Sequence, residues 1–435
     1  MKISLKKNQF LDYYAIFYLF IDVICTYIGM EFGLVPFFIF FILAVPFYKG
    51  IEHFISIVLL LSTISYYFFG AYENILSIHT ILVFVSIISL VMKKTIREIN
   101  LTNGFAIVSL CVVAYISYSN SPYGYLSGLF RVLYILISTY IVGAISHIDL
   151  KKLSCILPKL ASTLLWLYAI IITLNPVVDS AKRLSLSENV NGNTFAMSCA
   201  ISVCVVFLDY YMLRGKKLCF IKILTLILGL ILILLSGSRT ALMATVLSCA
   251  IIMIIKAKRE KRLEGTIFKL AILGIFVIAA LYVVATVMNL DISRYNYIKV
   301  IQSGGTNRAT IYQKLIPFIF DNQYYIYGYG PGHDCTRQIL LSLVNRNYAH
   351  SHNTFLEAFG ELGGIGLVLT VICTITSFRR ISNSCIDEKS NYIMFGILLC
   401  ILISSVGESY FCYAVYWIIL LICRQSRGEK RRKVI

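Results

Sequence analysis

The sequence predicts an all-α polytopic membrane protein with about 14 transmembrane helices (roughly 12–14). Of its 435 residues, 59% are hydrophobic and only 14% are charged, where a soluble domain carries about 25% charged residues. Apolar stretches near the length that a helix needs to cross about 30 Å of hydrocarbon recur along the whole chain. A spanning β-barrel would instead show short segments of alternating hydrophobicity, and the sequence has no such pattern.

The first apolar stretch follows three lysines, as the core of a signal peptide would. No small-residue cleavage site comes after it, so we interpret it as a retained first helix. The spanning segments are expected near residues 10–28, 31–48, 53–70, 76–92, 104–119, 126–146, 156–176, 193–212, 219–235, 240–256, 267–289, 354–378, 391–407 and 409–423.

Lysine and arginine gather in alternate loops of this arrangement. The basic loops include those at Lys93–Arg97, Arg214–Lys217, Lys256–Arg262 and Arg424–Lys433, whereas the loop at Glu408 has no lysine or arginine. Basic loops face the cytoplasm, so both termini are expected there. The same rule accounts for the net charge of +18, and we expect no nucleic-acid partner.

One long segment, residues 290–353, is expected outside the cell membrane as an extracytoplasmic loop. It contains a helix-like stretch, Arg308–Phe320, which could lie on the outer membrane interface, and then a tight turn at Gly328–Gly332. Long structured loops are often functional. We divide the chain into N-terminal transmembrane helices at 1–184, a core at 185–380 and C-terminal helices with a basic tail at 381–435.

Basic residues on the outer face call for an explanation, because that face is poor in lysine and arginine elsewhere. Guanidinium groups suit phosphate, so an anion site is one reading, and solvated charges in a long loop are the other. Arg239 is the stronger candidate, since it begins a helix at the membrane boundary, where the helix dipole favours anions. Arg131 lies inside the sixth predicted helix and either faces the same site or reaches toward lipid phosphates.

His352 precedes the twelfth predicted helix, with Asn353 or Thr354 as the expected helix cap. A neutral imidazole can take a proton from a hydroxyl group. Glu357 follows at helical spacing and could orient a base or line the helix. No metal-ligand spacing of cysteine or histidine appears, and we expect no metal, no cofactor and no structural disulfide among the 13 cysteines.

Four stretches resemble the O-antigen ligase and Wzy-type O-antigen polymerase superfamily. They are Leu235–Ala241; Arg308 with Asp321–Asn322 and Gly328–Gly332; His352–Asn353 followed by Gly363–Gly366; and Asn189–Asn193. Each stretch alone is weak, but their order, their spacing and their shared outer placement make the combination specific. The resemblance runs from about residue 185 to 380.

The resemblance implies a GT-C-like glycosyltransferase that uses an undecaprenyl-diphosphate-linked glycan as donor and another as acceptor. It further implies that the enzyme inverts the anomeric centre and works without a metal. It implies that His352 is the general base and that Arg239 and Arg308 hold the diphosphate. Which of His350 and His352 is the base stays open. The remaining residues expected to bind substrate are Arg131, Asn191, Asn193, His350, Asn353 and Glu357.

Three functions follow from these observations. The first is a polymerase of O-antigen, capsular or exopolysaccharide in the bacterial cytoplasmic membrane, working with a flippase and a chain-length regulator. The second is an O-antigen ligase that passes polymer to lipid A-core or to protein. The third is a lipid-linked oligosaccharide flippase or other transporter, which would predict related halves and a polar central path.

Overall fold

The structure, a computed structural model, describes residues 2–28, 34–61, 63–64, 78–93, 101–145, 148–178, 183–187, 190–212, 220–265, 307–345, 348, 350–382, 388–411 and 413–425. Most of these residues are helical. The first half contains α1 (Lys2–Ile28), α2 (Leu34–Ala44), the 3-10 helix η1 (Val45–Lys49), α3 (Ile51–Leu61), α5 (Ile78–Lys93), α6 (Leu101–Asn120), α7 (Leu126–Ile145) and α8 (Leu150–Leu174).

A short antiparallel pair, β1 (Val177–Val178) and β2 (Leu184–Ser185), separates α8 from the second half. That half contains α9 (Gly192–Met212), α10 (Phe220–Leu235), α11 (Arg239–Arg259), α14 (Asn307–Asp321), α15 (His333–Val344), α16 (Thr354–Ser382), α17 (Glu388–Ser404) and α18 (Ala414–Gln425). Every predicted span overlaps one of these helices except 267–289, which lies outside the described residues.

The helices form a bundle with α9 at its centre. α9 packs against α8, α10, α11 and α17, and most of its residues are buried, as expected for a helix that is apolar all round. Six helices of the described chain are long and apolar enough to cross a membrane, and several shorter helices are also apolar. The protein is therefore a polytopic helical membrane protein.

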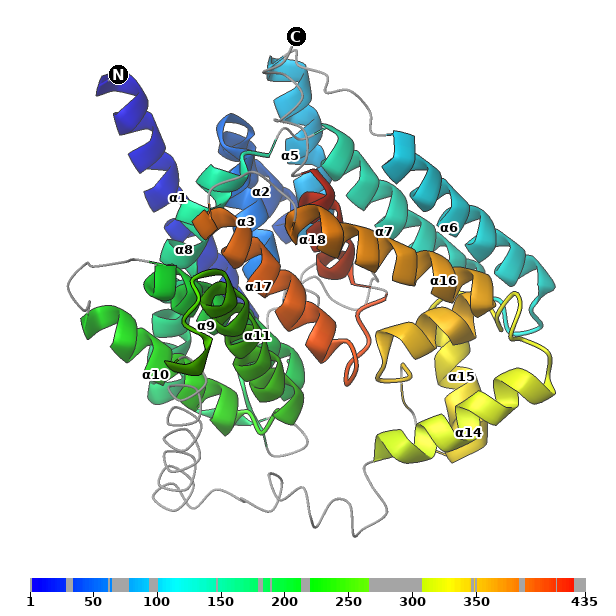
Figure 1. The fold of residues 1–435 in the computed structure, drawn as a ribbon. Coiled ribbons are helices and arrows are strands. Elements are labelled where there is room, and N and C mark those ends of the chain that lie inside the picture. Colours follow the sequence, from blue (N-terminus) through cyan, green and yellow to red (C-terminus); the bar gives the residue numbers. More distant parts are fainter. Residues whose placement is uncertain are drawn as a thin grey trace.

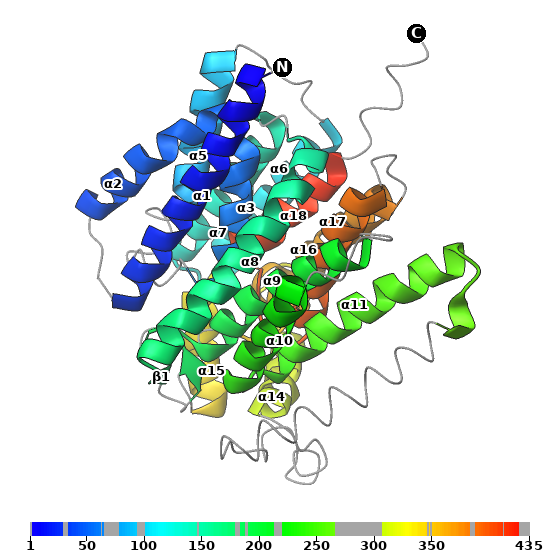
Figure 2. The ribbon, with the colours of Figure 1, turned by 90° about the vertical axis from the view of Figure 1, so that its left-hand side faces the viewer.

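Large apolar side chains on the outside of the bundle support this conclusion. On α16, Ile365, Val368, Ile372 and Ile375 are all exposed and recur at helical spacing, so they form one apolar stripe. In water such a stripe would be unfavourable, whereas in a bilayer it faces hydrocarbon. The start of α1 and the end of α18 lie toward one end of the bundle, and α14 and α15 lie at the opposite end (Figures 1 and 2).

The described part of the predicted long loop is folded. The predicted helix at Arg308–Phe320 is confirmed as α14, whose Ile311, Leu315 and Ile319 lie on one face and pack with α15 in a small separate core. α15 itself was not predicted. Pro317 lies within α14 and does not end it.

α16 is broken by a sharp backbone bend at its tenth residue. Gly363 has φ +68° and ψ −170°, so a first arm, 354–362, and a second arm, 364–382, run in different directions (Figure 1). The turn after α14 docks onto this bend, because Tyr329 N–H donates to Gly360 C=O at 2.8 Å and Gly364 N–H donates to Tyr325 C=O at 2.7 Å. The bend therefore ties the α14–α15 unit to α16.

Only glycine fits at residue 363. A Cβ there would lie 2.0 Å from the carbonyl oxygen of Ile326, and the backbone conformation is one that L-residues rarely adopt. We predict that Gly363→Ala destabilises the protein by about 1–3 kcal/mol, measured as a lower melting temperature in detergent. The matched control is Gly364→Ala, whose Cβ would meet its nearest atom at 3.0 Å. Equal melting temperatures for the two variants would contradict the close packing.

Candidate functional site

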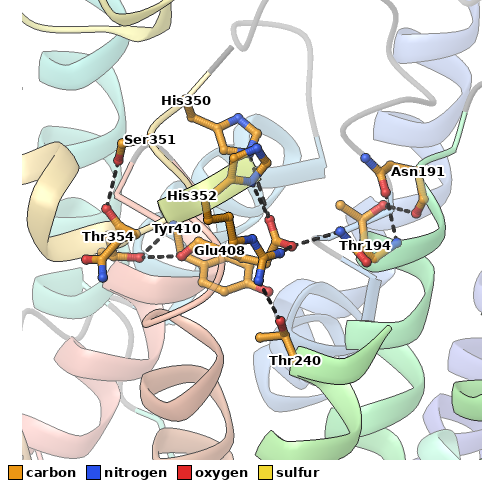
Figure 3. A network of polar contacts seen from close by, with 12 residues as sticks. Asn191, Thr194, Thr240, His350, Ser351, His352, Thr354, Glu408 and Tyr410 are labelled. Atoms are coloured by element: carbon orange, nitrogen blue, oxygen red, sulfur yellow. Dashed lines mark hydrogen bonds and ion pairs between the residues drawn. The ribbon is translucent and has the colours of Figure 1, made fainter. Parts of the chain in front are cut away.

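Four helices begin around one point at the end of the bundle that carries α14 and α15. The start of each contributes a residue: Asn193 from α9, Thr240 from α11, Arg308 from α14 and Thr354 from α16. All four contact either Glu408, in the turn after α17, or the guanidinium that Glu408 binds (Figure 3). Because helix N-termini carry partial positive charge, their convergence favours an anion here.

The Glu408 carboxylate is the centre of these contacts. Its Oε1 accepts hydrogen bonds from Arg308 Nη2 at 2.5 Å and from Asn193 Nδ2 at 2.8 Å. Its Oε2 lies 3.3 Å from His352 Nδ1. The side chain is only 12% exposed, so these partners replace most of its hydration.

The contact with Glu408 fixes the proton position on His352. An ionised carboxylate only accepts hydrogen bonds, so Nδ1 donates to it, and Nε2 holds the lone pair whenever the ring carries a single proton. His350 packs against this ring with centroids 4.5 Å apart, but its Nε2 is 3.9 Å from Glu408 Oε2, beyond hydrogen-bond distance. Of the two histidines, His352 thus has the geometry of an oriented base.

The backbone at His352 is held in a sparsely populated conformation, with φ +58°. Tyr312 Oη donates to the His352 carbonyl at 3.1 Å. Asn353 Oδ1 then caps α16 by accepting from the N–H groups of Phe355 and Leu356, which confirms Asn353 as the cap. Left-handed non-glycine residues that neighbours hold in place occur often at functional sites.

The charges of the site follow from burial and neighbours. Burial alone would raise the pKa of the Glu408 carboxyl, but His350, His352 and Arg308 outweigh it and hold that pKa well below its usual range. Burial lowers the pKa of His350, despite the opposing effect of Glu408. At neutral pH the site therefore contains an ionised Glu408 and an uncharged His350 beside a charged Arg308.

Arg239 and Arg308 lie on adjacent helix starts. Arg308 Nη1 donates to Thr240 Oγ1 at 3.2 Å, and Arg239 immediately precedes that threonine as the first residue of α11. Within the described part of the chain, the half-buried Arg239 guanidinium has no hydrogen-bond or ion-pair partner. Among the described residues, its guanidinium is therefore available to a ligand.

Two predicted site residues, Arg131 and Glu357, lie in a second, deeper cluster. Arg131 of α7 interacts electrostatically with Glu357, with Glu361 and with His333 of α15. His333 Nε2 is 3.1 Å from Glu357 Oε1, without hydrogen-bond geometry. Burial and the charge of Arg131 lower the pKa of His333. The rings of His333 and His350 are 5.7 Å apart, so the two clusters adjoin.

The amide of Asn191 performs a local structural role. Its Oδ1 accepts from Asn193 N–H and from Arg183 Nη2, both at 2.9 Å, which caps α9 and orients its first turn. Of the predicted residues, His352, His350, Arg308 and Asn193 thus meet at Glu408. Asn191 and Asn353 shape the helix starts that carry them.

Residues 224–371 match the family model of the O-antigen ligases. This segment is an O-antigen ligase domain. The match confirms the resemblance drawn from the sequence, and it supports glycosyl transfer of the O-antigen ligase or polymerase type, with a lipid-linked glycan as substrate. No curated protein matches the chain.

The O-antigen ligase domain contains Arg239, Arg308 and His352, but it does not contain all of the site. Glu408 lies after it and Asn193 before it. Sequence reasoning missed Glu408, which stands alone in a short loop between two spans. The available signal was an acidic residue at a membrane boundary, where an ionised group is costly unless it has a partner.

His350, His352 and Glu408 also place one potential metal-ligand atom each within 4.8 Å of one another. Arg308 and Asn193 already bind Oε1 of that carboxylate. A divalent cation would therefore share its only acidic ligand with a guanidinium, which is a poor fit. That the O-antigen ligase domain works without a metal stays a prediction.

Proposed function

We propose that the protein polymerises undecaprenyl-diphosphate-linked repeat units into O-antigen, capsular or exopolysaccharide by inverting, metal-independent glycosyl transfer. The observation that carries the proposal is that Arg308 and His352, two residues of the O-antigen ligase domain, both contact the Glu408 carboxylate. Arg239 begins the helix whose Thr240 contacts Arg308. An anion-binding pair and an oriented base are the two groups that displacement of a lipid diphosphate requires.

The proposed step is a single displacement. Nε2 of His352 takes the proton of the acceptor hydroxyl while the hydroxyl oxygen bonds to the anomeric carbon of the donor. The bond from that carbon to the diphosphate oxygen breaks, and the lipid diphosphate leaves with the electron pair. Arg239 and Arg308 stabilise its growing negative charge, which matters most where water is scarce. Attack opposite the leaving group inverts the anomeric centre.

We further propose that the chain crosses the bacterial cytoplasmic membrane about fourteen times, with a GT-C-like fold, both termini in the cytoplasm and the 290–353 loop outside. The placement of the start of α1 and the end of α18 toward one end of the bundle supports this orientation (Figure 1). It would put the site where a lipid-linked glycan presents its diphosphate. A flippase and a chain-length regulator would be the working partners.

Reporter fusions test this orientation. Alkaline phosphatase fused after Asn120 or Asn345 is expected to be active, because both positions would be outside. A fluorescent protein fused after Arg259 or at the C-terminus is expected to fluoresce, because both positions would be cytoplasmic. If phosphatase were active after only one of Asn120 and Asn345, the α6–α7 connection and the loop would lie on opposite sides.

Substitutions test the chemistry. We expect His352→Ala to lower turnover about 10²–10⁴-fold, and Arg239→Ala or Arg308→Ala about 10²–10³-fold, in an assay that extends a purified lipid-linked repeat unit. His350→Ala is expected to lower turnover less than His352→Ala, because only His352 bonds to Glu408. The matched control is Arg337→Ala, which removes an exposed arginine of α15. If folded His352→Ala protein still made full-length polymer, His352 would not be the base.

The family match is to O-antigen ligases, and this observation favours ligation as the second candidate function. Polymerase and ligase would share the same donor chemistry and differ in the acceptor. A deletion strain separates them. Loss of polymer itself is expected for a polymerase, whereas polymer that accumulates without attachment to lipid A-core or protein would identify a ligase. The same match gives no support to transport.

A further inference from the structure

We propose that Glu408 is a positioning residue that occupies the donor's anion site before binding and stabilises the protonated His352 during transfer. The inference rests on the proposed function and assigns one carboxylate two opposed effects. The Glu408 carboxylate weakens binding of the lipid diphosphate, and the same carboxylate accelerates the chemical step.

The first effect follows from where the carboxylate lies. Glu408 Oε1 accepts from Arg308 at 2.5 Å and from Asn193 at 2.8 Å, and the same donors suit a phosphate oxygen. Four helix N-termini converge on this point and favour an anion. In the protein without substrate, that anion is Glu408. An arriving diphosphate must share Arg308 with a negative charge, which opposes its binding.

The second effect follows from the other carboxylate oxygen. Oε2 lies 3.3 Å from His352 Nδ1, so a proton gained at Nε2 creates a cation next to an ionised carboxylate. That attraction is absent while the imidazole is neutral and grows as the proton transfers. An interaction that is stronger in the transition state than in the ground state raises turnover. The same charge that opposes donor binding therefore favours reaction.

The position of Glu408 does not depend on its charge. Thr354 Oγ1 donates to the Glu408 carbonyl at 3.1 Å and accepts from Tyr410 N–H at 2.8 Å, while Thr354 N–H donates to Ser405 C=O at 2.9 Å. These backbone contacts hold the 405–410 turn against the start of α16. Replacing the carboxylate by an amide of the same shape leaves them intact.

Glu408→Gln tests both effects on the full-length protein in nanodiscs. We expect binding of undecaprenyl diphosphate to tighten about 10-fold, because Arg308 is released and a like charge is removed. We expect turnover with the lipid-linked repeat unit to fall about 100-fold, within the range for an impaired base. A residue that merely stabilised the fold would not tighten binding. Glu408→Asp keeps the charge and is expected to retain more turnover than Glu408→Gln.

Two comparisons complete the test. Asp321→Asn removes an exposed acidic group of the same loop unit and is expected to change neither quantity. In a His352→Ala background, Glu408→Gln should cause no further loss of turnover, because its effect on the chemical step acts through that imidazole. Unchanged or weaker binding by Glu408→Gln, with His352→Ala inactive, would overturn this inference alone. Normal turnover by His352→Ala would instead overturn the proposed function.

Discussion

The ion pair between Arg308 and Glu408 is the interaction around which the site is arranged. Arg308 belongs to a loop helix that packs in its own small core, and Glu408 belongs to the turn between two helices of the bundle. Their contact therefore joins the loop to the membrane body at the point where His352 is oriented. Removing the two charges of such a partly buried pair from water costs free energy. Their attraction offsets this cost only when further hydrogen bonds satisfy both groups. Asn193, Thr240 and His352 provide those bonds.

A second constraint acts on the same unit from the other side. The bend of α16 at Gly363 receives the turn after α14, and neither backbone leaves room for a side chain there. The first arm of α16 is thus fixed at both ends, by the Asn353 cap at its start and by the docked turn at its end. These two attachments explain how His352, which precedes α16 and has a strained backbone, can hold a defined orientation.

The apolar pattern was enough to predict the helices, because a helix that crosses hydrocarbon must be apolar over most of its length. The α14 helix was equally readable from Ile311, Leu315 and Ile319. α15 was missed although Cys335, Ile339 and Leu340 recur at helical spacing and pack into the same small core. Arg308, His352 and Asn193 could be found from residue type and from resemblance. For Glu408 the sequence offered only an acidic residue at a membrane boundary, since its importance lies in distant partners that only the fold brings to it.

The site is assembled from more of the chain than the matched O-antigen ligase domain covers. Arg308 and His352 lie within residues 224–371, whereas Glu408 and Asn193 lie beyond its two edges. A chimera that exchanged only the matched segment with a relative would separate the guanidinium and the imidazole from the carboxylate that both contact. Grafts meant to transfer this site should therefore carry the α17–α18 turn and the start of α9 together with the matched segment.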